Sequence, residues 1–194
     1  MRSIIRETIE SISLALLVFL LLRTSMQVYG VHGPSMEPQL VEHDLVVVNK
    51  VVYLSVDAQR ASRFLPWVNA AQGEEWSPFH PPRQGEVVVL HNPFPPGPDL
   101  VKRMIAGPGD TVELVQGVVF VNGKRLDEPY IKYPSRDGYG PVVIGPNRYF
   151  VLGDNRIRSE DSRFFGMVPR EQIVGKVWLG YWPLDRFGFL LATP

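Results

Sequence analysis

Residues 100–123 have the sequence LVKRMIAGPGDTVELVQGVVFVNG, which contains the pattern that recurs through most of the chain. Short runs of β-branched and other apolar residues alternate with turns rich in Gly, Pro and Asn. Gly107-Pro108-Gly109-Asp110 is typical of a tight turn, and Asn122-Gly123 is typical of a two-residue hairpin. This stretch therefore predicts neighbouring antiparallel strands.

Similar apolar runs lie on both sides of this stretch. Together with the runs at 111–115 and 118–121 inside the stretch, we expect strands at residues 45–48, 86–90, 111–115, 118–121, 142–144, 149–152 and 173–179. Gly (17) and Pro (18) are too frequent among the 194 residues for a helical bundle. The sequence therefore predicts a mainly β protein built around an antiparallel sheet.

Residues 57–82 have no clear hydrophobic period and carry Phe64, Trp67, Trp76 and Phe79. We interpret them as an inserted aromatic loop. These aromatic side chains either pack on the parent domain or touch a bilayer interface.

The N-terminus contains an almost unbroken apolar stretch, ISLALLVFLLL, at residues 12–22. A helix extended over residues 8–28 is about 31 Å long, which matches the hydrocarbon core of a bilayer. We predict a membrane anchor over residues 1–30 and a β domain over residues 31–194; a cleaved secretory signal is the alternative. Arg2 and Arg6 before the span favour placing the β domain outside the cytoplasm.

The composition excludes several classes of function. The 20 Lys and Arg residues balance the 20 Asp and Glu residues, so a general nucleic-acid binder is disfavoured. The chain has no cysteine, which excludes disulfides, thiolate catalysis and cysteine-ligated metals. A hydrolytic nucleophile would have to be a hydroxyl.

Ser35 is the candidate nucleophile, because Gly33-Pro34-Ser35-Met36-Glu37-Pro38 presents it between two rigid prolines. The residues alone do not identify the general base that would activate Ser35. The histidines at positions 32, 43, 80 and 91 are candidates, and so is Lys102, whose amine could lose its charge at a half-buried strand position.

A third polar segment, GDNRIRSEDSR at residues 153–163, directly follows an apolar run. Loops after buried strands often hold active sites. A surface loop with local ion pairs explains the same residues.

Four segments in this order behind an apolar span closely resemble bacterial type I signal peptidases. They are GPSMEPQL (33–40), GEVVVL (85–90), KRMIAGPGD (102–110) and GDNRIRSEDSRFFG (153–166). The resemblance implies a membrane-anchored Ser-Lys endopeptidase whose catalytic body faces away from the cytoplasm. Its implied partners are preprotein signal peptides and the lipid bilayer, with assembly on the export channel left open; no metal, cofactor or nucleic acid is implied.

The resemblance also implies roles for individual residues. Ser35 is the expected nucleophile, Lys102 the general base, and Ser159 the hydroxyl that orients the lysine amine. An ion pair of Asp161 and Arg163 is expected to brace the site. The remaining expectations are a pair between Asp154 and Arg103, and shallow pockets for small substrate side chains lined by Val31, Met36, Leu40 and Val101.

One departure from the family's pattern concerns the hydrogen-bond donors to the oxyanion. Some members of this family carry a serine where this chain has Gly33, so the Ser35 backbone N–H is expected to be the main donor. Three competing interpretations are a catalytically silent, membrane-tethered module that binds signal peptides, a self-cleaving repressor-type protease, and a β-rich scaffold protein. The co-occurrence of Ser35, Lys102 and Ser159 disfavours the silent module.

Overall fold

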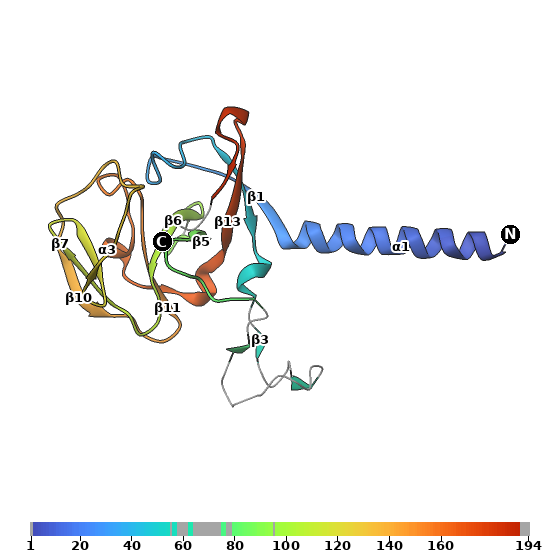
Figure 1. Cartoon of the computed structure of the whole chain (residues 1–194), viewed down its shortest axis with the longest axis horizontal. Helices are drawn as coiled ribbons and strands as arrows, with labels where there is room; N and C mark the ends of the chain where they lie inside the picture. Colours follow the sequence, from blue (N-terminus) through green and yellow to red (C-terminus); the bar gives the residue numbers. More distant parts are fainter. Residues whose placement is uncertain are drawn as a thin grey trace.

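A long N-terminal helix, α1 (Arg2–Ser25), leads into a body of antiparallel strands (Figure 1). The computed structural model describes residues 2–54, 56–57, 62–63, 75–76, 79–94 and 96–190. The most apolar 18-residue window of Arg6–Ser25 has a mean hydropathy of 1.6, and none of its residues is buried. By length and composition this helix could cross a membrane.

The helix ends earlier than the expected boundary at residue 28. Met26–Gly30 form strand β1 instead, which pairs with β2 (Leu45–Asn49) from Met26 opposite Asn49 to Gly30 opposite Leu45. Val28 and Tyr29 favour extended backbone, and residues 26–30 pair with β2 instead of extending the helix. The expected anchor of residues 1–30 is therefore helix only as far as Ser25.

The main sheet is antiparallel and has the strand order β1-β2-β13-β5-β6-β11-β12, with β14 also paired to β13. The strands after β2 are β5 (Val87–Leu90), β6 (Leu100–Ala106), β11 (Arg148–Leu152), β12 (Val168–Pro169), β13 (Ile173–Trp182) and β14 (Gly188–Phe189). These strands confirm the prediction of a mainly antiparallel β fold. Three short 3-10 helices, η1 (Val51–Tyr53), η2 (Arg170–Gln172) and η3 (Leu184–Arg186), lie between strands.

Strand β5 explains why residues 87–90 are continuously apolar. Val87 and Val89 pack in one hydrophobic cluster, whereas Val88 and Leu90 pack in another. Alternate side chains of a strand point to opposite faces, so the sheet is covered on both sides at this strand.

The main sheet curls so that its first strand approaches β6. Three strands separate β1 from β6 in the sheet order, yet Tyr29 of β1 interacts with Asp99, the residue before β6. Burial raises the pKa of Tyr29, and the Asp99 carboxylate raises it further. A flat sheet could not bring these two residues together.

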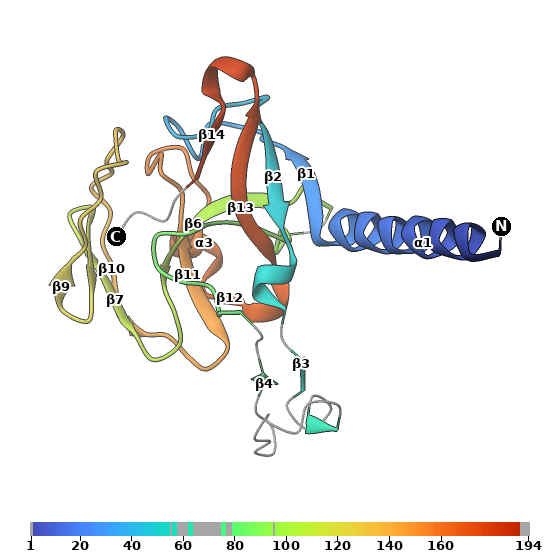
Figure 2. The same ribbon diagram turned by 45° about the vertical axis from the view of Figure 1, so that its right-hand side comes forward.

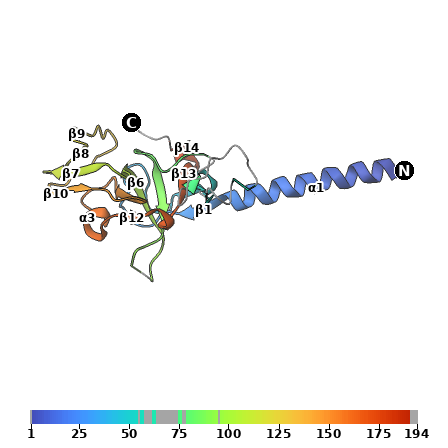
Figure 3. The ribbon, with the colours of Figure 1, turned by 90° about the horizontal axis from the view of Figure 1, so that it is seen from below.

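A second, four-stranded sheet has the order β10-β7-β8-β9. Its strands are β7 (Thr111–Val115), β8 (Val118–Val121), β9 (Lys124–Arg125) and β10 (Tyr139–Val143). The predicted hairpin joins β8 to β9, with Asn122 and Gly123 both at positive φ (52° and 74°). Figures 1 and 3 both show this sheet on the side of the body opposite to α1.

The predicted insertion begins and ends in a two-stranded ribbon of β3 (Val56–Asp57) and β4 (Glu75–Trp76), which projects from the body (Figure 2). Phe79 is exposed. Phe64 and Trp67 lie outside the described residues, so the predicted contacts of the loop remain a prediction.

Candidate active site

Ser35 lies in the loop between β1 and β2. Backbone hydrogen bonds close this loop: the N–H of Val31 donates to Asp44 O (2.8 Å) and the N–H of His43 donates to Val31 O (2.9 Å). Gly33 has φ of +76°, a conformation that favours glycine. Ser35 is therefore held, only partly buried, on a segment with a fixed backbone path.

Lys102 reaches Ser35 from the middle of β6. Its side chain is almost fully buried, with the residue 2% exposed, and its Nζ donates to Ser35 Oγ over 2.9 Å. Burial lowers the pKa of Lys102 to about 8, although the carboxylates of Asp161, Glu160 and Asp154 oppose this shift. A lysine with this pKa has an appreciable neutral fraction near physiological pH and can act as a base.

The polar segment of residues 153–163 follows β11 and packs against the loop that carries Ser35. The N–H of Asn155 donates to Ser35 O over 3.0 Å. A Cβ on Gly153 would overlap both the side chain of Ser159 and the carbonyl oxygen of Ser35. Neither Asn155 nor Gly153 was predicted as a site residue. The available signal was a glycine directly after a buried strand, where close backbone approach is common.

Ser159 is buried, with 5% of the residue exposed, and its Oγ has no hydrogen-bond partner among the described residues. It also lies against Gly153, which in turn contacts Ser35. The structure thus brings Ser159 to the site but does not give it a hydrogen bond to Lys102. Its orienting role stays a prediction.

Two buried ion pairs surround these groups. Asp161 accepts from Arg163 Nε (2.8 Å) and from the N–H of Gly153 (3.0 Å), and its side chain caps the short helix α3 (Ser162–Phe165). Asp154 accepts two hydrogen bonds from Arg103, at 2.8 and 2.7 Å, with both side chains fully buried. The first pair is local to the segment after β11, and the second ties that segment to β6.

The four histidines have other surroundings. None of them has a hydrogen bond to Ser35 among the described residues. His91 Nδ1 lies 2.9 Å from Asp99 Oδ1, and His80 Nε2 lies 4.0 Å from Glu86 Oε1. His32 and His43 are exposed. The geometry therefore favours Lys102 as the base.

The four predicted pocket residues lie together. Val31, Met36 and Leu40 are 1–3% exposed and belong to one hydrophobic cluster, against which the partly buried Val101 packs. This cluster underlies the Ser35 loop, since Met36 directly follows Ser35. In the described part of the chain, no three His, Asp or Glu side chains are grouped as metal ligands.

Comparison with known proteins shows which family the chain is similar to. The sequence model of the family described as "Signal peptidase, peptidase S26" matches residues 5–182. The chain is 38% identical over 156 residues to a probable signal peptidase I-2 from Synechocystis sp., an alignment that covers 80% of this chain and 63% of that relative. It is 34% identical over 206 residues to signal peptidase IB from Staphylococcus aureus (strain COL), covering 96% of this chain and 94% of the relative. A crystal structure of a signal peptidase I from Enterococcus faecalis V583 aligns with 50% of this chain and 97% of its own, with 30% identity and a TM-score of 0.45.

Proposed function

The chain belongs to the signal peptidase family, peptidase S26, and from this premise we propose that it is a membrane-anchored serine endopeptidase that removes signal peptides from exported preproteins. Ser35 is the nucleophile and Lys102 is the general base. The observation that carries the assignment is the 2.9 Å hydrogen bond between Lys102 Nζ and Ser35 Oγ at a buried amine.

In the first chemical step, Ser35 Oγ attacks the scissile carbonyl carbon while the neutral Lys102 amine takes the hydroxyl proton. Lys102 then gives this proton to the leaving amine as the peptide C–N bond breaks, which leaves an acyl-enzyme on Ser35. In the second step, Lys102 takes a proton from water, and the resulting attack releases the signal peptide. Serine and lysine together perform the chemistry of a catalytic triad.

The Ser35 backbone N–H would stabilise the oxyanion. It makes no backbone hydrogen bond among the described residues, so it is available to an incoming carbonyl oxygen. One such donor typically contributes about 3 kcal/mol to transition-state stabilisation. Ser159 Oγ, unpartnered beside the site, would orient the Lys102 amine during proton transfer.

An extended peptide fits between β1 and the first half of β6. The pairing of β6 with β11 covers only residues 103–106, and β1 is the first strand of its sheet, so both have an edge without a strand partner among the described residues. Such edges bind peptides as an added strand. Val31, Met36, Leu40 and Val101 would form the apolar surface that accepts small side chains at the third and first residues before the cut; the support is that they pack in one cluster next to Ser35.

The proposed arrangement has two parts, an anchor formed by α1 and a catalytic body formed by the β structure that follows. Two basic residues near the start of α1, Arg2 and Arg6, favour a cytoplasmic N-terminus and a catalytic body on the extracytoplasmic side. Digestion of intact spheroplasts with an added protease tests this orientation, because only an extracytoplasmic body would be degraded.

The central experiment uses full-length protein in detergent and a preprotein with an Ala-x-Ala cleavage site. Wild type should cut after the final Ala, and Ser35→Ala and Lys102→Ala should abolish cutting while remaining folded by circular dichroism. Lys124→Ala, which changes an exposed lysine in β9, is the matched control and should cut normally. Normal cutting by Lys102→Ala would show that Lys102 is not the base and would favour a histidine in that role. Binding of the substrate without cutting by wild type would favour the catalytically silent binding module.

A further inference from the structure

Three adjoining hollows lead away from Ser35 toward the second sheet. The near hollow, about 290 Å³, is lined by Glu37, Asn155 and Arg158 among others. The middle hollow, about 410 Å³, shares Ile157 with the near one. The far hollow, about 550 Å³, shares Pro134 and Arg156 with the middle one. The three form a continuous surface that begins two residues from the proposed nucleophile.

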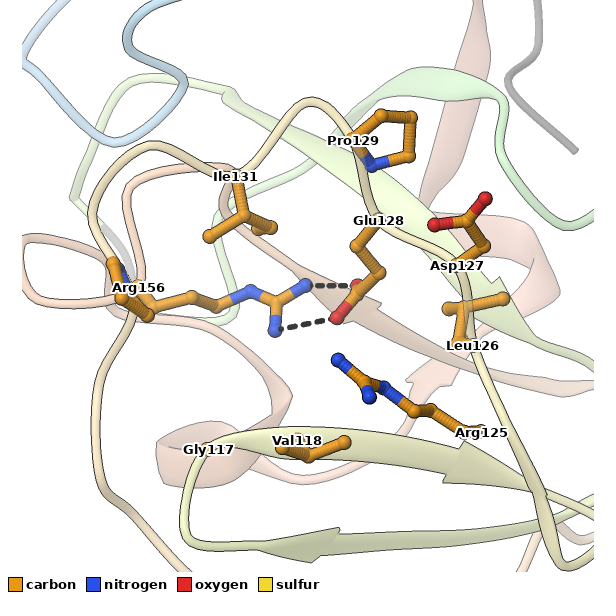
Figure 4. Close-up of a pocket in the computed structure, with 10 residues that line it drawn as sticks. Gly117, Val118, Arg125, Leu126, Asp127, Glu128, Pro129, Ile131 and Arg156 are labelled. Carbon is orange, nitrogen blue, oxygen red and sulfur yellow. Dashed lines mark hydrogen bonds and ion pairs between the residues drawn. The ribbon is translucent and has the colours of Figure 1, made fainter.

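Part of this surface is built from buried polar groups. The Arg156 side chain is 1% exposed; it pairs with Glu128 and its Nε donates to Gly153 O over 3.1 Å. Figure 4 shows the Arg156–Glu128 pair in the wall of the far hollow, with the guanidinium group of Arg125 turned toward it. Arg156 thus connects the wall of the far hollow to the segment that packs against Ser35.

Three of the unpaired charges on this surface are positive and two are negative. Arg125, Arg136 and Arg158 are exposed and have no ion-pair partner among the described residues. The acidic side chains Glu128 and Asp137 are paired with Arg156 and Arg163. Glu37 and Asp127 are the unpaired acidic residues of the three linings, so unpaired arginines exceed unpaired carboxylates by one. In the middle hollow the unpaired charged residue is Arg136.

The position of the hollows determines which part of a substrate meets them. α1 and β1 lie on one side of the body, and the second sheet lies on the opposite side (Figures 1 and 2). If α1 crosses the membrane, the apolar signal peptide remains on the α1 side. The chain beyond the cut must then leave on the side of the hollows.

We propose that the three hollows bind the first residues of the mature chain, directly after the cleavage site, and that Arg158 and Arg136 select acidic side chains there. This inference rests on the proposed function. Because the mature segment is the leaving group, these contacts act on acylation of Ser35 and are gone when the acyl-enzyme is hydrolysed. Their effect should appear in kcat/KM and not in the rate of deacylation.

The test compares three peptide substrates that are identical through an Ala-x-Ala site and carry two Asp, two Ser or two Lys residues at the second and third positions after the cut. For full-length wild type, kcat/KM should be about threefold or more higher for the Asp peptide than for the Lys peptide, the size expected of exposed ion pairs. The preference should weaken at 1 M salt. Arg158→Glu and Arg136→Glu should each reduce or reverse it, while cleavage of the Ser peptide reports that the variant is folded and active.

Arg148→Glu makes the same charge change at an exposed position of β11 outside the hollows, and should leave the Asp-to-Lys ratio unchanged. Equal kcat/KM for the three peptides, or an equal shift of the ratio in Arg148→Glu, would overturn the inference while the proposed function stands. Failure of wild type to cut any of the three peptides would overturn both.

Discussion

Gly153 packs directly against the side chain of Ser159, so closely that a Cβ on Gly153 would overlap the Ser159 hydroxyl. The same Cβ would also overlap the carbonyl oxygen of Ser35. Three parts of the site therefore meet at one glycine: the end of β11, the loop that carries Ser159 and the loop that carries Ser35. The distance between the two serine loops depends on the absence of a side chain at position 153.

Gly153→Ala should separate these loops and lower kcat/KM by about 100-fold or more, because misplacement of reacting groups by about 1 Å can have an effect of that size. The rates of peptide cleavage and the thermal midpoints of the two proteins test this. Gly188→Ala is the matched control, since a Cβ there meets no atom within 4 Å. Near-normal cleavage by Gly153→Ala would show that the loops can shift without consequence.

The pH dependence of cleavage should follow the ionisation of Lys102. The proposed base must be neutral, and its pKa is about 8. The value of kcat/KM should therefore rise tenfold per pH unit below about pH 8 and level off above it. An acid limb centred near pH 6 to 6.5 would instead indicate a histidine base.

Lys102 should make the folded protein less stable at neutral pH. Its pKa is about 8 in the folded state and 10.5 unperturbed, so between these values the unfolded chain binds more protons and the free energy of unfolding rises with pH. The difference between the two pKa values corresponds to about 3 kcal/mol of lost folding stability. The loss is complete below pH 8 and absent above pH 10.5. Lys102→Met should abolish cleavage yet raise the free energy of unfolding at pH 7, as measured by urea denaturation. Equal or lower stability of this variant would contradict the low pKa.

Asp161 should raise the pKa of the catalytic lysine. Its carboxylate is the largest of the charges that oppose the effect of burial on Lys102, ahead of Glu160. Asp161→Asn should therefore move the acid limb of kcat/KM to lower pH, and Glu160→Gln should move it in the same direction by less. The pH profiles of the folded variants check this. A shift to higher pH in Asp161→Asn would show that Asp161 acts on Lys102 in some other way.

Local sequence patterns were sufficient to predict most of the strands. The apolar runs and the turns at residues 107–110 and 122–123 predicted β6, β7, β8 and their connections, because those signals depend on neighbouring residues. Strand β1 was not predicted because the helix was extended to residue 28 to match the thickness of a bilayer, and only the pairing with β2 makes residues 26–30 a strand. The two-residue strands β9, β12 and β14 are too short to leave a periodic pattern.

The site could be predicted only through the resemblance to a family. Ser35 and Lys102 are 67 positions apart, and nothing in either segment indicates that they touch. Their contact depends on the curl of the sheet, which brings the β1–β2 loop to β6. From the residues alone a histidine base remained open, and the roles of Gly153 and Asn155 became visible only in the packed loops.

Substitution of Ser159 should affect catalysis without lowering the stability of the fold. Its buried hydroxyl has no partner among the described residues, whereas the buried hydroxyl of Ser162, three positions later, accepts from the N–H of Val151 over 3.0 Å. Ser159→Ala removes an unsatisfied polar group, so the free energy of unfolding of this variant should be unchanged or higher. Ser162→Ala leaves a buried N–H without an acceptor, so its free energy of unfolding should fall by about 1–3 kcal/mol. If Ser159 orients Lys102 during catalysis, Ser159→Ala should still lower kcat by about tenfold or more. Ser159→Ala that is stable and fully active would assign the serine a packing role against Gly153 alone.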